Sequence, residues 1–245
     1  MICIILAAGY ATRLYPLTKN FPKPLLQVNG KTVLDWVIDD LDERITSYVV
    51  ISNHKYSKSF SDWAGFKDKK IVVLDDGTTT NETRLGAVKD LELAIDTLNI
   101  SSDCLVLAGD NLFDYSLNKF LDYSKDKKTS CVARYELLNN EEMKKHGGVI
   151  VDNNDIVIDM FEKSPNPKSN WCCPTLYYLL KKDIKLIKKA IKDGIKTDAP
   201  GDFISWLIRN NIKMHAYNIP GNVYDIGNLE SYEKIKKEYK GYKDK

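Results

Sequence analysis

The residues best suited to chemistry lie near the N-terminus, in the stretch LAAGYATRLYPLTKNFPKPLL from Leu6 to Leu26. Two cations in this stretch, Arg13 and Lys23, stand in a loop that three prolines stiffen. A guanidinium and an ammonium held in fixed positions suit a polyphosphate ligand. The loop follows an apolar run and opens with small residues, whose backbone N–H groups can approach a ligand closely. These small residues are Ala7, Ala8 and Gly9.

Two aspartates follow strand-like runs further along the chain. Asp110 ends the run LVLAGD, and Asp225 follows the short run NVY. The carboxyl ends of parallel strands are where open α/β sheets bind ligands. A single aspartate after a strand is also common as a turn residue or a helix cap. The sequence around each residue leaves both interpretations open.

Other polar segments have an ordinary interpretation when taken alone. Glu162 and Lys163 would form a solvated pair at the edge of a hairpin, and residues 76–87 would form a surface loop that leads into a helix.

The stretch from Leu6 to Leu26 is not a P-loop and has one glycine where the dinucleotide-binding motif needs three. It closely resembles the signature of the sugar-phosphate nucleotidylyltransferases (NDP-sugar pyrophosphorylases), L-A-A-G-x-x-[ST]-R-L-x-P-L-T-x-x-x-P-K-P-L. The chain matches every fixed position of that signature. The resemblance implies transfer of a nucleotidyl group from an NTP to a sugar 1-phosphate, with Mg²⁺ as cofactor and release of pyrophosphate. dTTP or UTP with a glucose-1-phosphate-like acceptor is the favoured pair.

The same resemblance assigns roles to residues that match the family's motifs. The catalytic residues are Arg13 and Lys23. The nucleotide-binding residues are Leu6, Ala7, Ala8, Gly9, Asn81, Gly86 and Asp110. The residues that bind the acceptor are Gly148, Glu162, Lys163 and Thr175, and the Mg²⁺ ligands are Asp110 and Asp225.

The chain departs from the family pattern at several points. Thr175 stands where hexose-binding members usually have glycine, and Pro174 precedes it. The resemblance places the segment that reads the nucleotide base at residues 76–87, and no glutamine lies just ahead of it, since the only one in the chain is Gln27. The smaller departures are Gly147 for an aromatic residue, Ser164 for a proline and Val223 for a tryptophan.

Two other functions stay open, and the first is favoured by the change at Pro174 and Thr175. One is a CTP-dependent cytidylyltransferase that acts on a non-sugar phosphate such as phosphocholine or an alditol phosphate. The other is a catalytically silent regulatory protein, although such relatives usually lose the cations or an acidic ligand that this chain retains.

The composition limits the remaining classes of function. With 36 basic and 34 acidic residues, the formal net charge of +2 argues against a nucleic-acid-binding protein. Five cysteines without a C-x-x-C motif suit a reducing compartment. The sequence shows no signal peptide and no apolar run long enough to cross a membrane. We therefore expect a cytoplasmic protein whose partners are an NTP and a phosphorylated small molecule, with a homo-oligomer left open.

Apolar strand-like runs alternate with helical patterns, which predicts an α/β protein. We expect a Rossmann-like three-layer sandwich with a mostly parallel mixed sheet, and a small β-hairpin insertion on the sugar side at 149–151 and 156–161. No repeat or linker divides the chain, so a single nucleotidyltransferase domain over 1–245 is expected, with a lysine-rich tail at 236–245 that frays. The other predicted strands are 1–6, 48–52, 70–74, 104–108, 129–135, 171–180, 212–219 and 222–224, and the predicted helices are 32–41, 84–98, 117–123, 183–192, 202–210 and one from 229.

Overall fold

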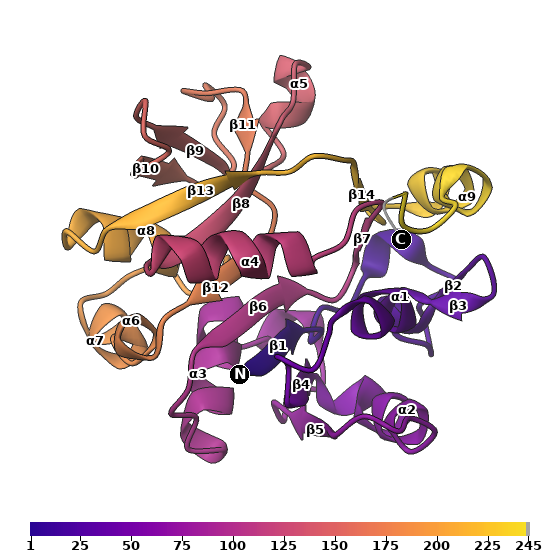
Figure 1. The fold of residues 1–245 in the computed structure, drawn as a ribbon. Helices are drawn as coiled ribbons and strands as arrows, with labels where there is room; N and C mark the ends of the chain where they lie inside the picture. The colour runs from indigo at the N-terminus through magenta and orange to yellow at the C-terminus, as the bar shows by residue number, and fades with distance from the viewer. Residues whose placement is uncertain (244–245) are drawn as a thin grey trace. The chain divides into compact units, whose positions relative to one another are not determined.

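The structure, a computed structural model, describes residues 1–243, and these residues group into two compact units. The first unit comprises Met1–Arg84, Ala108–Asn118 and the chain from Pro220 onward, and the second comprises Leu85–Leu107 and Lys119–Ile219. The single domain over 1–245 stays a prediction. Figure 1 shows the elements of both units.

The first unit contains a parallel three-stranded ladder. β1 (Ile2–Leu6) pairs with β4 (Ser47–Ser52), and β4 pairs with β5 (Ile71–Asp75), all in parallel. Apolar residues fill β1, three of them isoleucines, and its three central residues are fully buried, as expected for a strand covered on both faces. The small residues that follow Leu6 therefore lie at the carboxyl end of a buried parallel strand.

A second ladder in this unit is antiparallel and joins distant parts of the chain. β7 (Asn111–Phe113) pairs with β14 (Val223–Asp225) so that Asn111 lies opposite Asp225. This register places Asp225 beside the backbone that follows Asp110. The remaining elements of the unit are η1 (Thr12–Leu14), η2 (Lys23–Leu25), β2 (Gln27–Val28), β3 (Lys31–Thr32), α1 (Val33–Asp40), α2 (His54–Ala64), η3 (Asn81–Thr83) and α9 (Leu229–Glu238).

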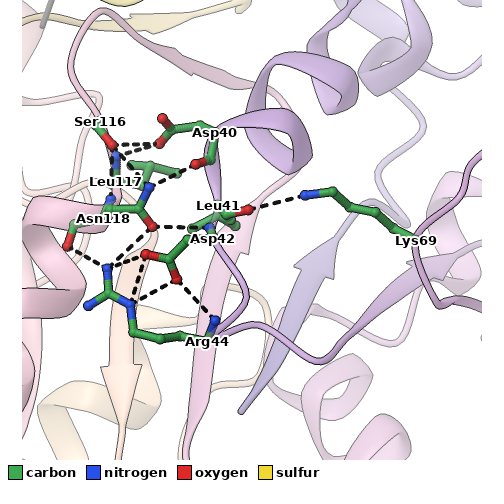
Figure 2. A network of polar contacts seen from close by, with 8 residues as sticks. All are labelled: Asp40, Leu41, Asp42, Arg44, Lys69, Ser116, Leu117 and Asn118. Carbon is green, nitrogen blue, oxygen red and sulfur yellow. Dashed lines mark hydrogen bonds and ion pairs between the residues drawn. The ribbon is translucent and has the colours of Figure 1, made fainter. Parts of the chain in front are cut away.

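Polar contacts fix the segment after β7 to the end of α1, as Figure 2 shows. The Asp40 carboxylate accepts hydrogen bonds from the Leu117 N–H (2.6 Å) and the Ser116 hydroxyl (3.3 Å). The Asn118 amide donates to the Asp40 carbonyl (2.8 Å). Lys69 donates to the Leu41 carbonyl (3.1 Å), which occupies one of the carbonyls that a helix end leaves without partners. The bonds from Ser116, Leu117 and Asn118 anchor the chain that leaves β7.

The C-terminal segment is packed, contrary to the expected fraying. Tyr239 is fully buried, and its hydroxyl donates to the Phe113 carbonyl at 2.9 Å. Lys243 pairs with the Asp114 carboxylate at 2.5 Å. The lysine content indicates an exposed tail, but the aromatic residues between the lysines supply the buried contacts. The expectation also covered residues 244–245, which lie outside the described residues.

The second unit is built on a mixed ladder in the order β10–β9–β11–β8–β12–β6, with β13 pairing in parallel with β8. The predicted hairpin is confirmed as β9 and β10, which pair antiparallel with Gly148 opposite Phe161. α8 packs against β10, and Figure 1 shows them next to each other. The elements of this unit are α3 (Ala87–Thr97), β6 (Cys104–Ala108), α4 (Asn118–Lys127), β8 (Ser130–Glu136), α5 (Asn140–Met143), β9 (Gly148–Val151), β10 (Val157–Phe161), β11 (Trp171–Cys172), β12 (Leu176–Leu179), α6 (Lys181–Ile184), α7 (Ile187–Lys192), α8 (Gly201–Arg209) and β13 (Met214–Asn218).

The expected α/β class with a mixed sheet is confirmed. Two predicted elements are interrupted in the structure. The strand expected at 171–180 is divided into β11 and β12, because Pro174 has no N–H to donate to a ladder. The helix expected at 183–192 is divided into α6 and α7.

Candidate active site

The loop after β1 is fixed by hydrogen bonds from the first unit. The Ala7 N–H continues the parallel pairing by donating to the Ile51 carbonyl at 2.9 Å, and the buried Asn53 amide donates to the Ala8 carbonyl at 2.8 Å. A methyl group added to Gly9 would meet no described atom within 4 Å. The small residues at 7–9 therefore form a fixed edge with open space at Gly9.

Buried apolar side chains anchor the part of this loop that runs from Leu14 to Leu26. Leu14 and Leu26 belong to one core cluster, which also contains Leu112, Ile226 and Tyr239. Pro24 lies against the backbone at Gly109, where an added Cβ would come within 3.0 Å of the proline ring. This packing connects the loop that carries the cations to the two segments that carry Asp110 and Asp225.

Lys23 is the centre of the polar cluster. Its side chain is only 12% exposed, and its Nζ lies 2.6 Å from Asp110 Oδ2 and 4.0 Å from Asp225 Oδ1. The same ammonium donates a hydrogen bond to the Ile226 carbonyl. Residues separated by more than a hundred positions thus converge on one cation, and the predicted proximity of Asp110 and Asp225 is present in the structure.

A third aspartate, Asp114, holds the start of the strand that carries Asp225 by hydrogen bonds. Asp114 is buried, and its carboxylate accepts hydrogen bonds from the Asn222 N–H (2.6 Å) and the Asn222 amide (2.7 Å), besides its pair with Lys243. Burial acts to raise the pKa of Asp114, but the hydrogen bonds from Lys243 and Asn222 outweigh it and lower the pKa. The ionised Asp114 carboxylate therefore fixes Asn222, the residue that precedes β14.

Arg13 is placed differently from Lys23. Its side chain is exposed in η1 and has no ion-pair partner in the described part of the chain. An unpaired exposed guanidinium at the rim of the loop can turn toward an anion without breaking a contact.

The segment after β5 also contacts the loop. Asp76 accepts hydrogen bonds from the Thr78 N–H and hydroxyl, both at 2.7 Å, and the Thr78 hydroxyl lies 3.3 Å from the Tyr10 hydroxyl. Asn81 is half-buried, and its carbonyl accepts a hydrogen bond from Arg84 at 3.0 Å. The contact between Thr78 and Tyr10 places the predicted base-reading segment beside the signature loop, the stretch from Leu6 to Leu26.

The predicted residues of the second unit form a separate set. Gly86 has φ +92°, and a Cβ there would lie 2.4 Å from the Thr197 carbonyl oxygen. Gly148 is buried, and a Cβ there would lie 2.4 Å from the Phe161 ring. Local backbone and packing therefore already require glycine at both positions, whatever they bind.

Glu162 is the most perturbed group in this set. Burial, with a contribution from the nearby charge of Asp202, raises its pKa to about 7, although Lys163 and the Gly201 N–H act in the opposite direction. Lys163 is exposed and adopts a left-handed backbone conformation with φ +29°. A carboxyl group whose pKa lies near neutrality is typical of a functional site.

Thr175 lies in the break between β11 and β12 and is half-buried, with its side chain hydrogen-bonded to Tyr177. Sequence reasoning missed two residues that hold site side chains, Asp114 and Gly201. The run Pro200-Gly201 at the start of a predicted helix was the available signal for the latter.

The two aspartates in the first unit fit a hard dication. Mg²⁺ is usually held by one or two carboxylates together with substrate phosphates. Asp110 and Asp225 supply two carboxylates that already share a cation, Lys23. Within residues 1–243 no group of three acidic, histidine or cysteine side chains could hold a metal by itself. The site therefore fits an ion that also requires the phosphates of a substrate.

The family model described as "Nucleotidyl transferase" matches residues 2–241. The chain belongs to the nucleotidyl transferase family. A protein from Methanocaldococcus jannaschii named "Bifunctional protein GlmU" is 30% identical to it over 98% of this chain and 57% of the relative. A protein from Sulfolobus acidocaldarius named "Putative mannose-1-phosphate guanyltransferase" is 30% identical over 95% of this chain and 61% of the relative. This nucleotidyl transferase chain thus spans about 57–61% of the length of these two relatives.

Solved structures share the fold of this nucleotidyl transferase. The structure titled as a UDP-glucose pyrophosphorylase complexed with UDP-glucose superposes with a TM-score of 0.81, covering 97% of both chains at 20% identity. At that identity the likeness shows the fold alone. In the described part of the chain, no helix has the length and apolar character to cross a membrane.

Proposed function

We propose that this chain transfers the nucleotidyl group of an NTP, with dTTP or UTP favoured, to a sugar 1-phosphate such as glucose 1-phosphate. The products are an NDP-sugar and pyrophosphate. The observation that carries the proposal is the position of Lys23, which lies within 4.0 Å of both Asp110 and Asp225 behind the signature loop. Such transfer depends mainly on alignment and charge neutralisation.

Each charged residue has a role in this proposal. Lys23 neutralises the α-phosphate and the attacking phosphate oxygen, and Arg13 balances the charge of the departing pyrophosphate. Because the acceptor phosphate is itself the nucleophile, no covalent enzyme intermediate is required. Asp110 and Asp225 would hold Mg²⁺, which supplies further charge neutralisation when bound.

The other predicted residues bind the two substrates in this scheme. The backbone at Leu6–Gly9, Asn81 and Gly86 contact the nucleotide. Glu162 accepts hydrogen bonds from acceptor hydroxyls, and Lys163 pairs with the acceptor phosphate, with Gly148 and Thr175 beside them. We also propose that the two units act as one nucleotidyltransferase domain, and that the five buried cysteines, which form no disulfide in the described part of the chain, reflect a cytoplasmic location.

A second candidate keeps the chemistry and changes the substrates. Thr175 and Pro174, in place of the glycine typical of hexose-binding members, favour a CTP-dependent cytidylyltransferase that acts on phosphocholine or an alditol phosphate. The polar side chain of Thr175 would occupy space that the glycine leaves for a sugar ring.

The test is pyrophosphate release with Mg²⁺ over a grid of substrates. The nucleotides are dTTP, UTP, CTP, ATP and GTP, the last included because one relative is named as a guanyltransferase. The acceptors are glucose, mannose, galactose and N-acetylglucosamine 1-phosphates, phosphocholine and an alditol phosphate. Turnover with dTTP or UTP and one hexose 1-phosphate supports the proposal, whereas turnover only with CTP and a non-sugar acceptor supports the second candidate. Absence of turnover throughout the grid refutes both.

A further inference from the structure

The start of α8 lies directly against the carboxylate of Glu162. Gly201 is the first residue of that helix, and its backbone N–H donates a hydrogen bond to Glu162. The first N–H groups of a helix have no partner within the helix, and the helix N-terminus favours a negative charge. Glu162 therefore receives a backbone donor from a different part of the chain.

This approach is closer than any side chain at position 201 would allow. A Cβ on Gly201 would lie 2.0 Å from Glu162 Oε1 and 2.5 Å from the Met160 methyl carbon. On another segment, a Cβ on Gly147 would lie 3.1 Å from Glu162 Oε2. Each oxygen of the carboxylate thus faces the bare backbone of a glycine.

The backbone conformation of Gly201 does not itself require glycine. Gly201 is absent from the residues with positive φ, in contrast to Gly86 and Gly194. Most amino acids are tolerated at the first residue of a helix, so the helix itself does not require glycine at this position. Space beside the carboxylate is therefore the reason that the structure gives for glycine here.

The backbone around Gly201 is fixed, whereas Glu162 ends in a flexible side chain. The Thr197 and Asp198 carbonyls accept hydrogen bonds from the N-terminal turn of α3, at 3.0 Å from the Val88 N–H and 3.2 Å from the Ala87 N–H. Further along α8, the Ser205 hydroxyl donates to the Met160 carbonyl at 3.1 Å. An added methyl group at position 201 would therefore displace the carboxylate and leave the helix in place.

We propose that Gly201 is a positioning residue that acts through Glu162 and sets the affinity for the acceptor. Its N–H faces the Glu162 carboxylate, and its missing side chain leaves the space that one carboxylate oxygen occupies. The inference rests on the proposed function in one respect, because it takes Glu162 as a group that binds acceptor hydroxyls.

The kinetic test is Gly201→Ala, compared with Gly65→Ala as a matched control. At Gly65 a new Cβ would have only ordinary contacts, at 3.5 and 3.6 Å, and the backbone is helical. With glucose 1-phosphate and dTTP, we expect Gly201→Ala to raise the acceptor KM about 10- to 100-fold and to leave the dTTP KM unchanged. Thermal stability should change little, because the two nearest atoms that the new methyl group would meet are the far ends of flexible side chains. An unchanged acceptor KM overturns the inference.

A double-mutant cycle separates action through Glu162 from a general packing effect. In a Glu162→Ala background the added methyl group has no carboxylate to displace, so Gly201→Ala should change the acceptor KM no further. In a Glu162→Asp background the shorter side chain should recover part of the loss caused by Gly201→Ala. A full additional loss in the Glu162→Ala background would show that Gly201 acts through Met160 or the helix, and would contradict the inference.

A spectroscopic measurement keeps the inference testable without turnover. The Glu162 carboxyl ¹³C resonance, assigned by its loss in Glu162→Gln, should shift in Gly201→Ala and titrate at a different pH, because the displaced carboxylate loses its contact with the Gly201 N–H and changes its burial. If the wild-type protein turns over no substrate, the proposed function fails and this resonance alone decides whether Gly201 positions Glu162. If the resonance and its titration are unchanged, the positioning contact is absent and the inference is wrong.

Discussion

Replacing Glu162 with glutamine should stabilise the protein at alkaline pH. Burial, together with the charge of Asp202, raises the pKa of Glu162 from 4.5 to about 7. The folded state therefore binds a proton more tightly than the unfolded state does, so the stability contributed by the protonated carboxyl is lost as pH rises from about 4.5 to about 7. At about 1.36 kcal/mol for each pH unit, this gap corresponds to at most about 3 kcal/mol. Glutamine has nearly the same shape and carries no charge.

Urea unfolding of the wild type and Glu162→Gln at pH 8 and pH 5 measures this effect. The free energy of unfolding of the variant should exceed that of the wild type by up to about 3 kcal/mol at pH 8 and by about 1 kcal/mol at pH 5. The matched control is Glu233→Gln, which changes an exposed carboxylate on α9 and should stay within about 0.5 kcal/mol at both values. The reasoning fails if Glu162→Gln is no more stable than the wild type at pH 8. Cys173 and Tyr177 also lie close to this carboxyl, and burial raises the pKa of both, so they stay neutral over this range.

Three further substitutions test other parts of the structure. Lys23→Ala should lower pyrophosphate release about 10²–10³-fold with an unchanged circular dichroism spectrum, and near-normal turnover would rule out its proposed role. Asp225→Asn removes one carboxylate from the cluster around Lys23, so the Mg²⁺ concentration for half-maximal activity should rise, and an identical Mg²⁺ titration would count against the metal assignment. Tyr239→Ala deletes a fully buried ring that lies 5.2 Å from the Trp36 ring, so urea unfolding should show a loss of about 3–5 kcal/mol. A loss below about 1 kcal/mol would show that the C-terminal segment does not stabilise the first unit.

The sequence predicts those elements whose own residues determine them. The apolar run before Leu6 and the hairpin at 149–161 form as expected, because strand patterning and turn residues are local properties. The pairing of Asp110 with Asp225 as metal ligands came from the resemblance to a family rather than from spacing, and it stays a prediction, although both carboxylates lie near Lys23. The fold class follows from the alternation of elements along the chain.

Contacts between residues far apart in the sequence could not be predicted from these local patterns. Nothing near Asp114 in the sequence indicates that Asn222 and Lys243 will donate to its carboxylate, which only the β7–β14 ladder brings about. The packed position of Tyr239 was missed because charge counts outweigh aromatic residues in a lysine-rich tail. Gly201 was missed because a glycine at a helix start has many local explanations, and its contact with Glu162 depends on how α8 meets β10.

The most direct test of nucleotidyl transfer follows the fate of two phosphorus labels. The experiment uses the NTP and the acceptor that turn over in the substrate grid. The NTP carries ³²P at the α position in one reaction and at the γ position in another. If Lys23, Asp110 and Asp225 support attack at the α-phosphorus, the α label will appear in a sugar nucleotide and the γ label in pyrophosphate. A γ label on the acceptor, or an α label released as free NMP, would contradict nucleotidyl transfer to an acceptor by this chain.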